Sequence, residues 1–226
     1  MRKPTSVEWN EWKAFVFRNF LCGQYYIYKM PIPKLQYKPS LLPSTELDVI
    51  KSLDAYGKQL KTIIDSLPTS LRTTLGEIHL PLDNGCELIE ALNTGQLLGA
   101  SDGSVRTNKT KTIGGHSYSL RHWNTDNYKL TGKSPTPYST TITSLTTELY
   151  GLLATTISFL VLTKTHQHRI VPSASATLTS DNEQAVKMAK EYEPVINISD
   201  TLKPEYDVQL LLYQIQQELP VTIYYK

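Results

Sequence analysis

The sequence has little cysteine, almost no net charge and no long apolar run. Its two cysteines, Cys22 and Cys86, lie far apart, fit no metal-binding spacing and give no disulfide framework, so we expect an intracellular protein. The formal net charge is +2, which lacks the global basic character of many nucleic-acid-binding domains. No apolar run reaches the roughly 18 residues of a membrane span, and the N-terminus lacks a signal-peptide core. We therefore expect no membrane association.

The composition otherwise describes an ordinary soluble protein. Of its 226 residues 40% are hydrophobic and 19% are charged, enough to build a buried core. Positive charge gathers in one place, because six basic residues and one acidic residue lie between Gly103 and Lys133. These are Arg106, Lys109, Lys111, Arg121, Lys129 and Lys133, against Asp126. A solvated hairpin face and a phosphate-binding surface explain this cluster equally well.

Residues 1–90 are predicted to form an N-terminal arm and helical brace. Residues 1–43 are rich in aromatic residues and proline, so much of this stretch should be extended or looped. From Ser44, leucine and isoleucine recur near helical spacing as far as Pro68, which predicts an amphipathic helix over 45–67. No chemistry-bearing motif is apparent in this part, which we interpret as a connection-like segment without catalytic groups.

Residues 91–226 have the pattern of an α/β domain. Three strands are predicted first, at 96–106, 114–123 and 127–133, joined as an antiparallel meander, with IGGHSY at 113–118 as a hairpin turn. A buried helix over 140–163, a strand at 175–181, helices at 182–192 and 202–220, and a strand at 221–226 follow. Pro204 suits the first turn of the second of these helices. The sequence therefore predicts a mixed sheet with parallel additions after the long helix, and flanking helices.

Three carboxylates stand in comparable contexts within this domain. Asp102 lies in the middle of a strand, in SDGS; Glu148 lies in an apolar helix, in TELYGLLA; Asp181 ends a strand, in TSDN. Singly, they could be a turn aspartate, a helix glutamate and a helix N-cap. Together they predict a convergent oxygen-rich site, because buried carboxylates without basic neighbours bind a divalent cation or show a raised pKa. Such sets suit Mg²⁺ or Mn²⁺.

The ordered motifs SDGS, TELYGLLA and TSDN resemble the ribonuclease H domain of retroelement reverse transcriptases. The resemblance extends over roughly residues 98–226, and the preceding LGEIHLPLDNGCELIEALNTG is similar to the lead-in to such domains. It implies a ribonuclease H-like fold and cleavage of the RNA strand of RNA–DNA hybrids. It also implies that Asp102 bridges two Mg²⁺ ions, for which Mn²⁺ may substitute, while Glu148 and Asp181 complete their coordination. The remainder of a reverse transcriptase polyprotein would be the partner.

The resemblance also implies residues that contact the 2′-hydroxyls of the RNA strand, which distinguish a hybrid from duplex DNA. Gly103 and Ser104 after the first aspartate, Ser144 one turn before Glu148, and Asn182 after Asp181 occupy the matching places.

The chain departs from the family in two respects. The family has a fourth carboxylate on a helix after the fifth strand, and the sequence ends at Lys226, so we expect a C-terminally truncated domain that is a poor nuclease in this form. Asp200 and Asp207 are available but precede that strand. From Ala176 to Lys226 four basic residues face eight acidic ones, where cellular relatives often carry a basic protrusion.

Other interpretations remain open from the sequence. A transposase or integrase shares the fold and a carboxylate triad, although its third carboxylate is generally a glutamate on a late helix. A catalytically degenerate scaffold domain is the other alternative, supported by the missing fourth carboxylate. The H-x-H pattern at 166–168 invites a metal-binding interpretation, but without cysteine or carboxylate companions it is better explained as a solvated loop.

Overall fold

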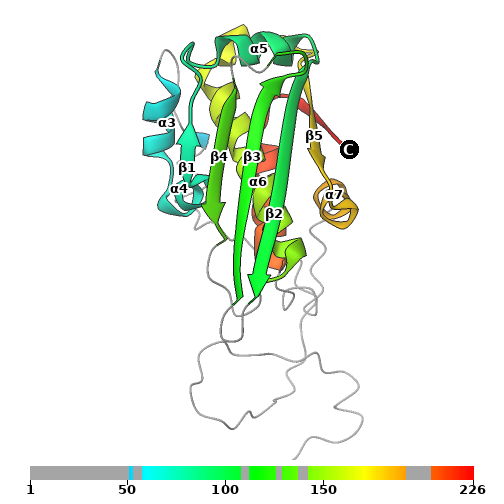
Figure 1. Cartoon of the computed structure of the whole chain (residues 1–226). Helices are drawn as coiled ribbons and strands as arrows, with labels where there is room; N and C mark the ends of the chain where they lie inside the picture. The colour runs from blue at the N-terminus through cyan, green and yellow to red at the C-terminus, as the bar shows by residue number, and fades with distance from the viewer. Residues whose placement is uncertain (1–50, 53–57, 108–111, 126–128, 137–141, 192–204) are drawn as a thin grey trace, which may run out of the picture.

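The structure, a computed structural model, describes residues 51–52, 58–107, 112–125, 129–136, 142–191 and 205–226 (Figure 1). The predicted aromatic and proline-rich arm at 1–43 lies outside these residues, as does Pro204. The described strands are β1 (Glu77–His79), β2 (Leu97–Thr107), β3 (Thr112–His122), β4 (Leu130–Pro135), β5 (Ser175–Ser180) and β6 (Thr222–Tyr225). The helices are α3 (Leu60–Ser66), α4 (Thr69–Leu75), α5 (Cys86–Asn93), α6 (Ser144–Thr165), α7 (Glu183–Lys190) and α8 (Tyr206–Gln217), with a short 3₁₀ helix at Gln167–Arg169.

The six strands form one mixed sheet in the order β1-β4-β3-β2-β5-β6. β2, β3 and β4 form an antiparallel meander, while β5 pairs parallel to β2 and β6 pairs parallel to β5. This pairing confirms the predicted α/β fold, with three antiparallel strands followed by parallel additions after the long helix. The strand that the sequence did not predict is β1, which pairs antiparallel with β4.

The long helix α6 packs behind β2 and β3 and organises the core (Figure 1). It begins with a capping box, in which Thr143 and Thr146 exchange side-chain and backbone hydrogen bonds. Its many threonines are tolerated in the interior because their hydroxyls donate to backbone carbonyls of the preceding turn, as Thr155 and Thr156 do. By length and composition α6 could also cross a membrane, but 89% of its apolar window is buried inside the protein, as expected for a core helix.

The N-terminal helices belong to the same core as the sheet. Buried side chains of α3, α4 and α5 join one hydrophobic cluster with α6 and the central strands; they are Leu60, Ile63, Leu71, Leu75, Leu88, Ile89, Ala91 and Leu92. The domain boundary predicted at residues 90–91 therefore falls inside α5, within a shared core. The helix predicted over 45–67 is not continuous among the described residues: Lys51 is helical, residues 58–59 are not, and α3 begins at Leu60. A second helix, α4, starts directly after Pro68.

Three successive carbonyls at the end of α4 are held by side chains of the sheet. Ser134 Oγ donates to the carbonyl of Thr73 (2.7 Å), and the Tyr118 hydroxyl donates to the carbonyl of Leu75 (3.0 Å). Between them, His116 Nε2 lies 2.8 Å from the carbonyl oxygen of Thr74. Helix C-termini leave such carbonyls without intrahelical partners. These bonds satisfy them and fix α4 to β3 and β4.

The hairpin turn predicted at IGGHSY, residues 113–118, is wrong, because these residues lie within β3. A Cβ atom on Gly114 would come within 2.6 Å of Thr147 Cγ2 and 2.7 Å of Ile142 Cγ2. The glycine is therefore explained by the close approach of the segment entering α6, which a turn prediction from a Gly-Gly pair does not consider.

Candidate active site

The structure brings the three predicted carboxylates together. Asp102 comes from the middle of β2, Glu148 from the second turn of α6, and Asp181 from the residue directly after β5. One carboxylate oxygen of each lies within 4.8 Å of the other two. Three hard oxygen donors at this spacing suit a divalent cation of the Mg²⁺ or Mn²⁺ type.

The end of β5 creates the opening through which Glu148 reaches this cluster. β5 pairs with β2 as far as Ser180 opposite Ser101, while β2 continues to Thr107. Beyond this point β2 has no strand beside it on this edge, and the backbone N–H of Gly103 donates a hydrogen bond to the Glu148 carboxylate instead. Ser180 Oγ donates a second hydrogen bond to the same carboxylate (3.2 Å). These two donors fix the orientation of the carboxylate at the edge of β2.

Glu148 is the buried member of the cluster. Its residue is only 3% exposed, whereas Asp102 and Asp181 are exposed. Burial raises the pKa of Glu148, and the neighbouring charges of Asp181 and Asp102 raise it further, against the opposing hydrogen bonds from Gly103 and Ser180. A raised pKa was expected for a buried carboxylate without basic neighbours, and burial is indeed the largest cause. A cation bound at the site would favour the ionised form of Glu148 again.

Asp181 does not cap α7, as its position next to the helix had suggested. The N-cap is Asn182, whose Oδ1 accepts a hydrogen bond from the backbone N–H of Ala185 (3.0 Å). The backbone N–H of Asn182 donates to Ser180 Oγ (3.3 Å). The carboxylate of Asp181 therefore stays with the cluster. The substrate-binding role implied for Asn182 stays a prediction, and its side chain is engaged in capping.

The other three residues implied to bind substrate occupy different environments. Gly103 faces α6, and a Cβ atom on it would lie 2.5 Å from the backbone nitrogen of Glu148. Gly103 therefore allows β2 to pack closely against α6, and its backbone N–H donates a hydrogen bond to Glu148. Ser104 is exposed one position further along β2, and Ser144 is exposed at the first residue of α6. Both side chains are accessible to a ligand, and their roles stay predictions.

Sequence reasoning missed Ser180, which bonds Glu148 and accepts from the backbone N–H of Asn182. Its signal was available in the TSDN motif, where a hydroxyl directly precedes the aspartate. Missed as well was Ser117, and the place of Lys133 beside the carboxylates was not foreseen; both line a shallow hollow of about 350 Å³ together with Asp102. They lie on strands separate in sequence from the SDGS motif, so only the strand pairing reveals them.

The remaining candidates lie apart from the cluster. Among the described residues no fourth carboxylate joins the group of three, and Asp200 lies outside them. Asp207, at the start of α8, lies near Tyr150, since its charge adds to the effect of burial in raising the pKa of that phenol. His166, predicted to be solvated, is buried, and its Nε2 lies 2.8 Å from the carbonyl oxygen of Asn84. That contact joins the end of α6 to the loop before α5.

Among the comparisons with known proteins, only the comparison with solved structures gives matches. No family model matches the chain, and no curated protein does. One similar solved structure is the N-terminal RNase H domain of Rv2228c from Mycobacterium tuberculosis, determined as a fusion with maltose-binding protein. It is 14% identical, with a TM-score of 0.39, and the match covers 57% of this chain and 81% of that one. RNase H1 from the halophilic archaeon Halobacterium salinarum matches with 12% identity, a TM-score of 0.36, and coverage of 58% and 86%.

Proposed function

We propose that this protein cleaves the RNA strand of RNA–DNA hybrids in a metal-dependent reaction, as the ribonuclease H domain of a retroelement polymerase. The observation that carries the proposal is the convergence of Asp102, Glu148 and Asp181 within 4.8 Å. Asp102 comes from the centre of a strand, Glu148 from a helix and Asp181 from the end of a strand, which is the order of these elements in the ribonuclease H motifs. The mixed sheet supports it, because it has the pairing that the resemblance implies.

Asp102, Glu148 and Asp181 would hold two Mg²⁺ ions, with Mn²⁺ as a substitute. Bound there, the cations would supply an activated water nucleophile and stabilise the charge on the leaving oxygen. The protein itself would orient the metal-binding carboxylates. Gly103 and Ser180 hold Glu148 in one position, while the exposed Asp102 and Asp181 leave room for a phosphodiester to approach.

Recognition of RNA would depend on hydrogen bonds to its 2′-hydroxyls. Ser104 and Ser144 are the accessible hydroxyl donors among the residues that the resemblance implies. Ser104 lies two residues after Asp102 on the same strand, and Ser144 lies one turn before Glu148. Their positions beside two of the three carboxylates support a role in holding the RNA strand during cleavage.

The test is cleavage of an end-labelled RNA–DNA hybrid by the full chain in Mg²⁺, in Mn²⁺ and in EDTA, with duplex DNA and duplex RNA as other substrates. We expect cleavage of the hybrid RNA strand in either metal and none in EDTA. Asp102→Asn should lower the rate by orders of magnitude, because it removes a charged ligand. The matched control is Asp65→Asn, an exposed aspartate on α3 whose partner is Lys61 (2.8 Å), which should cut like the wild type.

Each alternative predicts a different result. A transposase-like enzyme would cut duplex DNA in preference to the hybrid, and a scaffold domain would cut neither while still folding. Either result would contradict the proposal. The retroelement context is tested separately by reading the neighbouring coding sequence, which should encode a reverse transcriptase in the same frame.

A further inference from the structure

The face of the sheet opposite α6 is lined by exposed side chains. Figure 1 shows β4, β3 and β2 in front of α6, so that this face is turned toward the viewer. Residues alternate between the two faces, and Gly99, Ser101 and Gly103 are those on β2 that approach α6. Asp102 and Ser104 therefore project from the open face, beside the candidate active site.

Strand pairing sets four residues of this face in one row across the sheet. Asp102 is opposite Ser117, Ser117 is opposite Lys133, and Lys133 is opposite Glu77. All four side chains are exposed. Neighbouring strands lie about 4.8 Å apart, so Lys133 stands about 10 Å from Asp102 along the row. The row thus runs from the carboxylate cluster to β1, the strand that the sequence did not predict.

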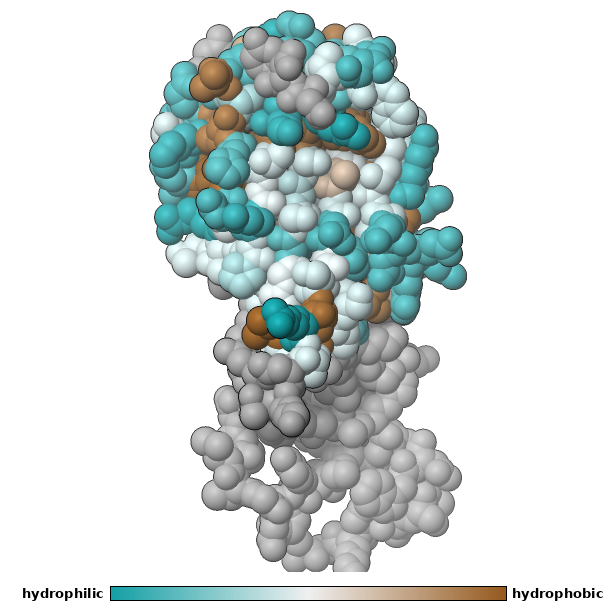
Figure 2. Space-filling view, in the orientation of Figure 1, coloured by the Kyte–Doolittle hydropathy of each residue, from teal (hydrophilic) through white to brown (hydrophobic). Residues whose placement is uncertain are grey.

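The row forms the floor of a continuous depression. Two shallow hollows, of about 350 and 410 Å³, share Glu77, Asp102, Ser117 and Lys133. We name the combined depression the cross-strand groove, whose remaining polar lining includes Ser104, Ser119, Thr131 and His79. In Figure 2 the middle of this face is pale, as expected for small hydroxyl residues and glycine. The groove is therefore accessible, mildly polar and joined directly to the carboxylates.

We propose that the cross-strand groove binds the nucleic acid whose phosphodiester enters the carboxylate cluster, with Lys133 as its phosphate-binding residue. This inference rests on the proposed function for the identity of the substrate. Lys133 would contact a phosphate roughly three nucleotides from the one that is cut, given a rise of about 3.4 Å per nucleotide along one strand. Ser117, Ser119 and Thr131 would donate hydrogen bonds to phosphate and sugar oxygens between these two points.

Charge supports a nucleic acid as the occupant. Lys133 closes the sequence cluster of six basic residues, of which Arg106 is exposed two positions after Ser104 on β2. A lysine ammonium is a compact phosphate-binding group. Small hydroxyls and backbone groups are likewise common partners of the phosphate and sugar backbone, which gives position without sequence preference. A ribonuclease for hybrids requires this kind of contact, since its substrate varies in sequence.

Glu77 holds Lys133 until the phosphate replaces it. Lys133 Nζ lies 3.2 Å from Glu77 Oε2, and both side chains are exposed, at 69% and 62%. Exposed ion pairs contribute little free energy, so a phosphate can displace the carboxylate at small cost. Once displaced, Glu77 adds a negative charge beside the bound strand. Glu77 is thus a competitor of the phosphate, and its removal should strengthen binding.

The test measures the binding of a fluorescent RNA–DNA hybrid, and of a DNA duplex of the same sequence, by anisotropy over a range of salt concentrations. All proteins carry Asp102→Asn so that the substrate is not cut. We expect Lys133→Gln to weaken binding by roughly three- to tenfold and to reduce the slope of log K against log salt by about 1. Glu77→Gln should strengthen binding by roughly two- to threefold, and this effect should be smaller in the Lys133→Gln protein, where only the repulsion between Glu77 and the strand remains.

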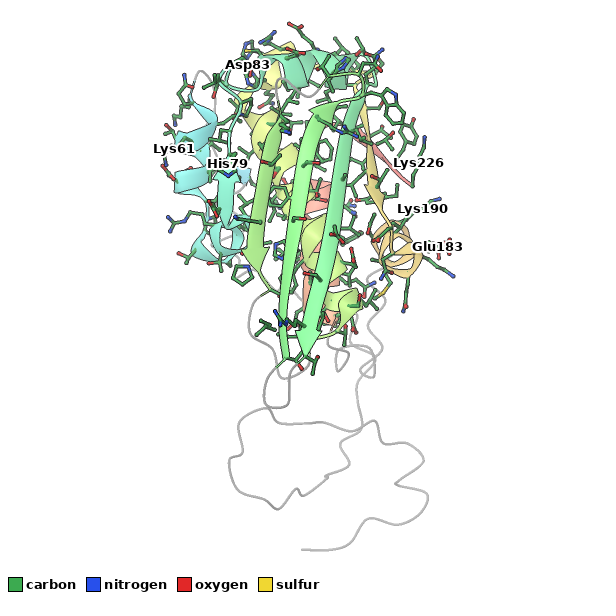
Figure 3. All side chains as sticks on the ribbon, viewed as in Figure 1. Lys61, His79, Asp83, Glu183, Lys190 and Lys226 are labelled. Carbon is green, nitrogen blue, oxygen red and sulfur yellow. The ribbon has the colours of Figure 1, made fainter. Side chains whose placement is uncertain are left out.

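The matched control is Lys61→Gln. Lys61 is a similarly exposed lysine (74%) paired with a carboxylate, Asp65, at 2.8 Å, but it lies on α3 and outside the groove (Figure 3). A hybrid with one uncharged methylphosphonate, moved along each strand in turn, locates the contact. One position should weaken binding to the protein that retains Lys133 and have no effect in Lys133→Gln.

The outcomes separate this inference from the proposed function. Lys133-dependent binding of either probe supports the groove, even if the wild-type chain cuts no hybrid. Binding that is indifferent to Lys133, or no binding of either probe, overturns the groove even if the wild type cuts hybrid RNA. A change in oligomeric state in Lys133→Gln with unchanged nucleic-acid binding also overturns it, because the face would then contact a second copy of the chain.

Discussion

The backbone N–H of Gly103 donates a hydrogen bond to the carboxylate of Glu148, joining the strand that carries Asp102 to the helix that carries Glu148. The contact requires glycine, since a Cβ atom at this position would lie 2.5 Å from the nitrogen of Glu148 and 2.6 Å from the carbonyl carbon of Thr147. The glycine of SDGS therefore sets the distance between two of the three carboxylates.

Gly103→Ala should damage the fold and the candidate site together. The methyl group meets helix backbone, which cannot rotate away, so α6 must shift; overpacking of this kind costs about 1–3 kcal/mol. Urea unfolding should show that loss, and hybrid cleavage should fall further than stability explains. Gly115→Ala is the control, since its Cβ would have its nearest contact at 3.4 Å, with the Ser134 carbonyl oxygen. Equal stability of the two variants would contradict this account of Gly103.

Metal binding should stabilise the folded protein through the three carboxylates. A ligand that binds the native state alone raises stability by an amount that grows with its concentration, about 2.7 kcal/mol at one hundred times Kd. Mg²⁺ should therefore raise the melting temperature of the wild type and not that of Glu148→Gln. The amide keeps the size of the side chain and can still accept from Gly103 and Ser180. An equal rise in both proteins would place the metal elsewhere.

The N-terminal boundary can be tested by truncation. Removing residues 1–90 deletes β1, α3, α4 and part of α5, and with them six of the largest buried side chains: Leu60, Ile63, Leu71, Leu75, Leu88 and Ile89. Each contributes about 1.5–3 kcal/mol by burial, so the sum rivals the stability of a whole domain. We expect that protein to be unfolded by circular dichroism, although the sequence suggests no catalytic groups in residues 1–90.

Removal of residues 1–57 is the matched truncation, because it leaves α3 and everything after it. This shorter protein should unfold cooperatively in urea, with a midpoint near that of the full chain. A folded protein starting at residue 91 would show that α3, α4 and β1 are an appendage to the core.

The sequence predicted the sheet from Leu97 onward because each strand there has its own local pattern and turn residues. The carboxylate cluster was predicted from the order of its motifs. β1 could not be predicted, since three residues carry no periodicity and their pairing with β4 depends on α4 being fixed to the sheet. Likewise, the row from Asp102 to Lys133 depends on strand register, which brings together residues 31 positions apart in the chain. Register is set by packing across the whole sheet.

His116 should make the fold sensitive to acid. The side chain is 4% exposed, its ring stacks on Tyr150, and its Nδ1 has no hydrogen-bond partner, so the buried imidazole is neutral. Burial lowers the pKa of His116 from 6.5, against the smaller opposing effect of the Thr74 carbonyl. The unfolded chain then binds more protons than the native one between that lowered pKa and 6.5. Stability is therefore complete above pH 6.5 and is lost as the pH falls through this window, by up to about 1.4 kcal/mol per pH unit.

His116→Gln isolates this effect, because glutamine can still donate to the Thr74 carbonyl but does not titrate. Urea unfolding of both proteins between pH 5 and 8 gives the difference in free energy at each pH. Glu148, whose raised pKa acts in the opposite direction, is present in both proteins and cancels in that difference. We expect the wild type to lose its advantage over the variant steadily below pH 6.5. A difference that stays constant with pH would mean that His116 binds its proton as readily in the folded protein as in the unfolded chain, and it would contradict a buried, neutral imidazole.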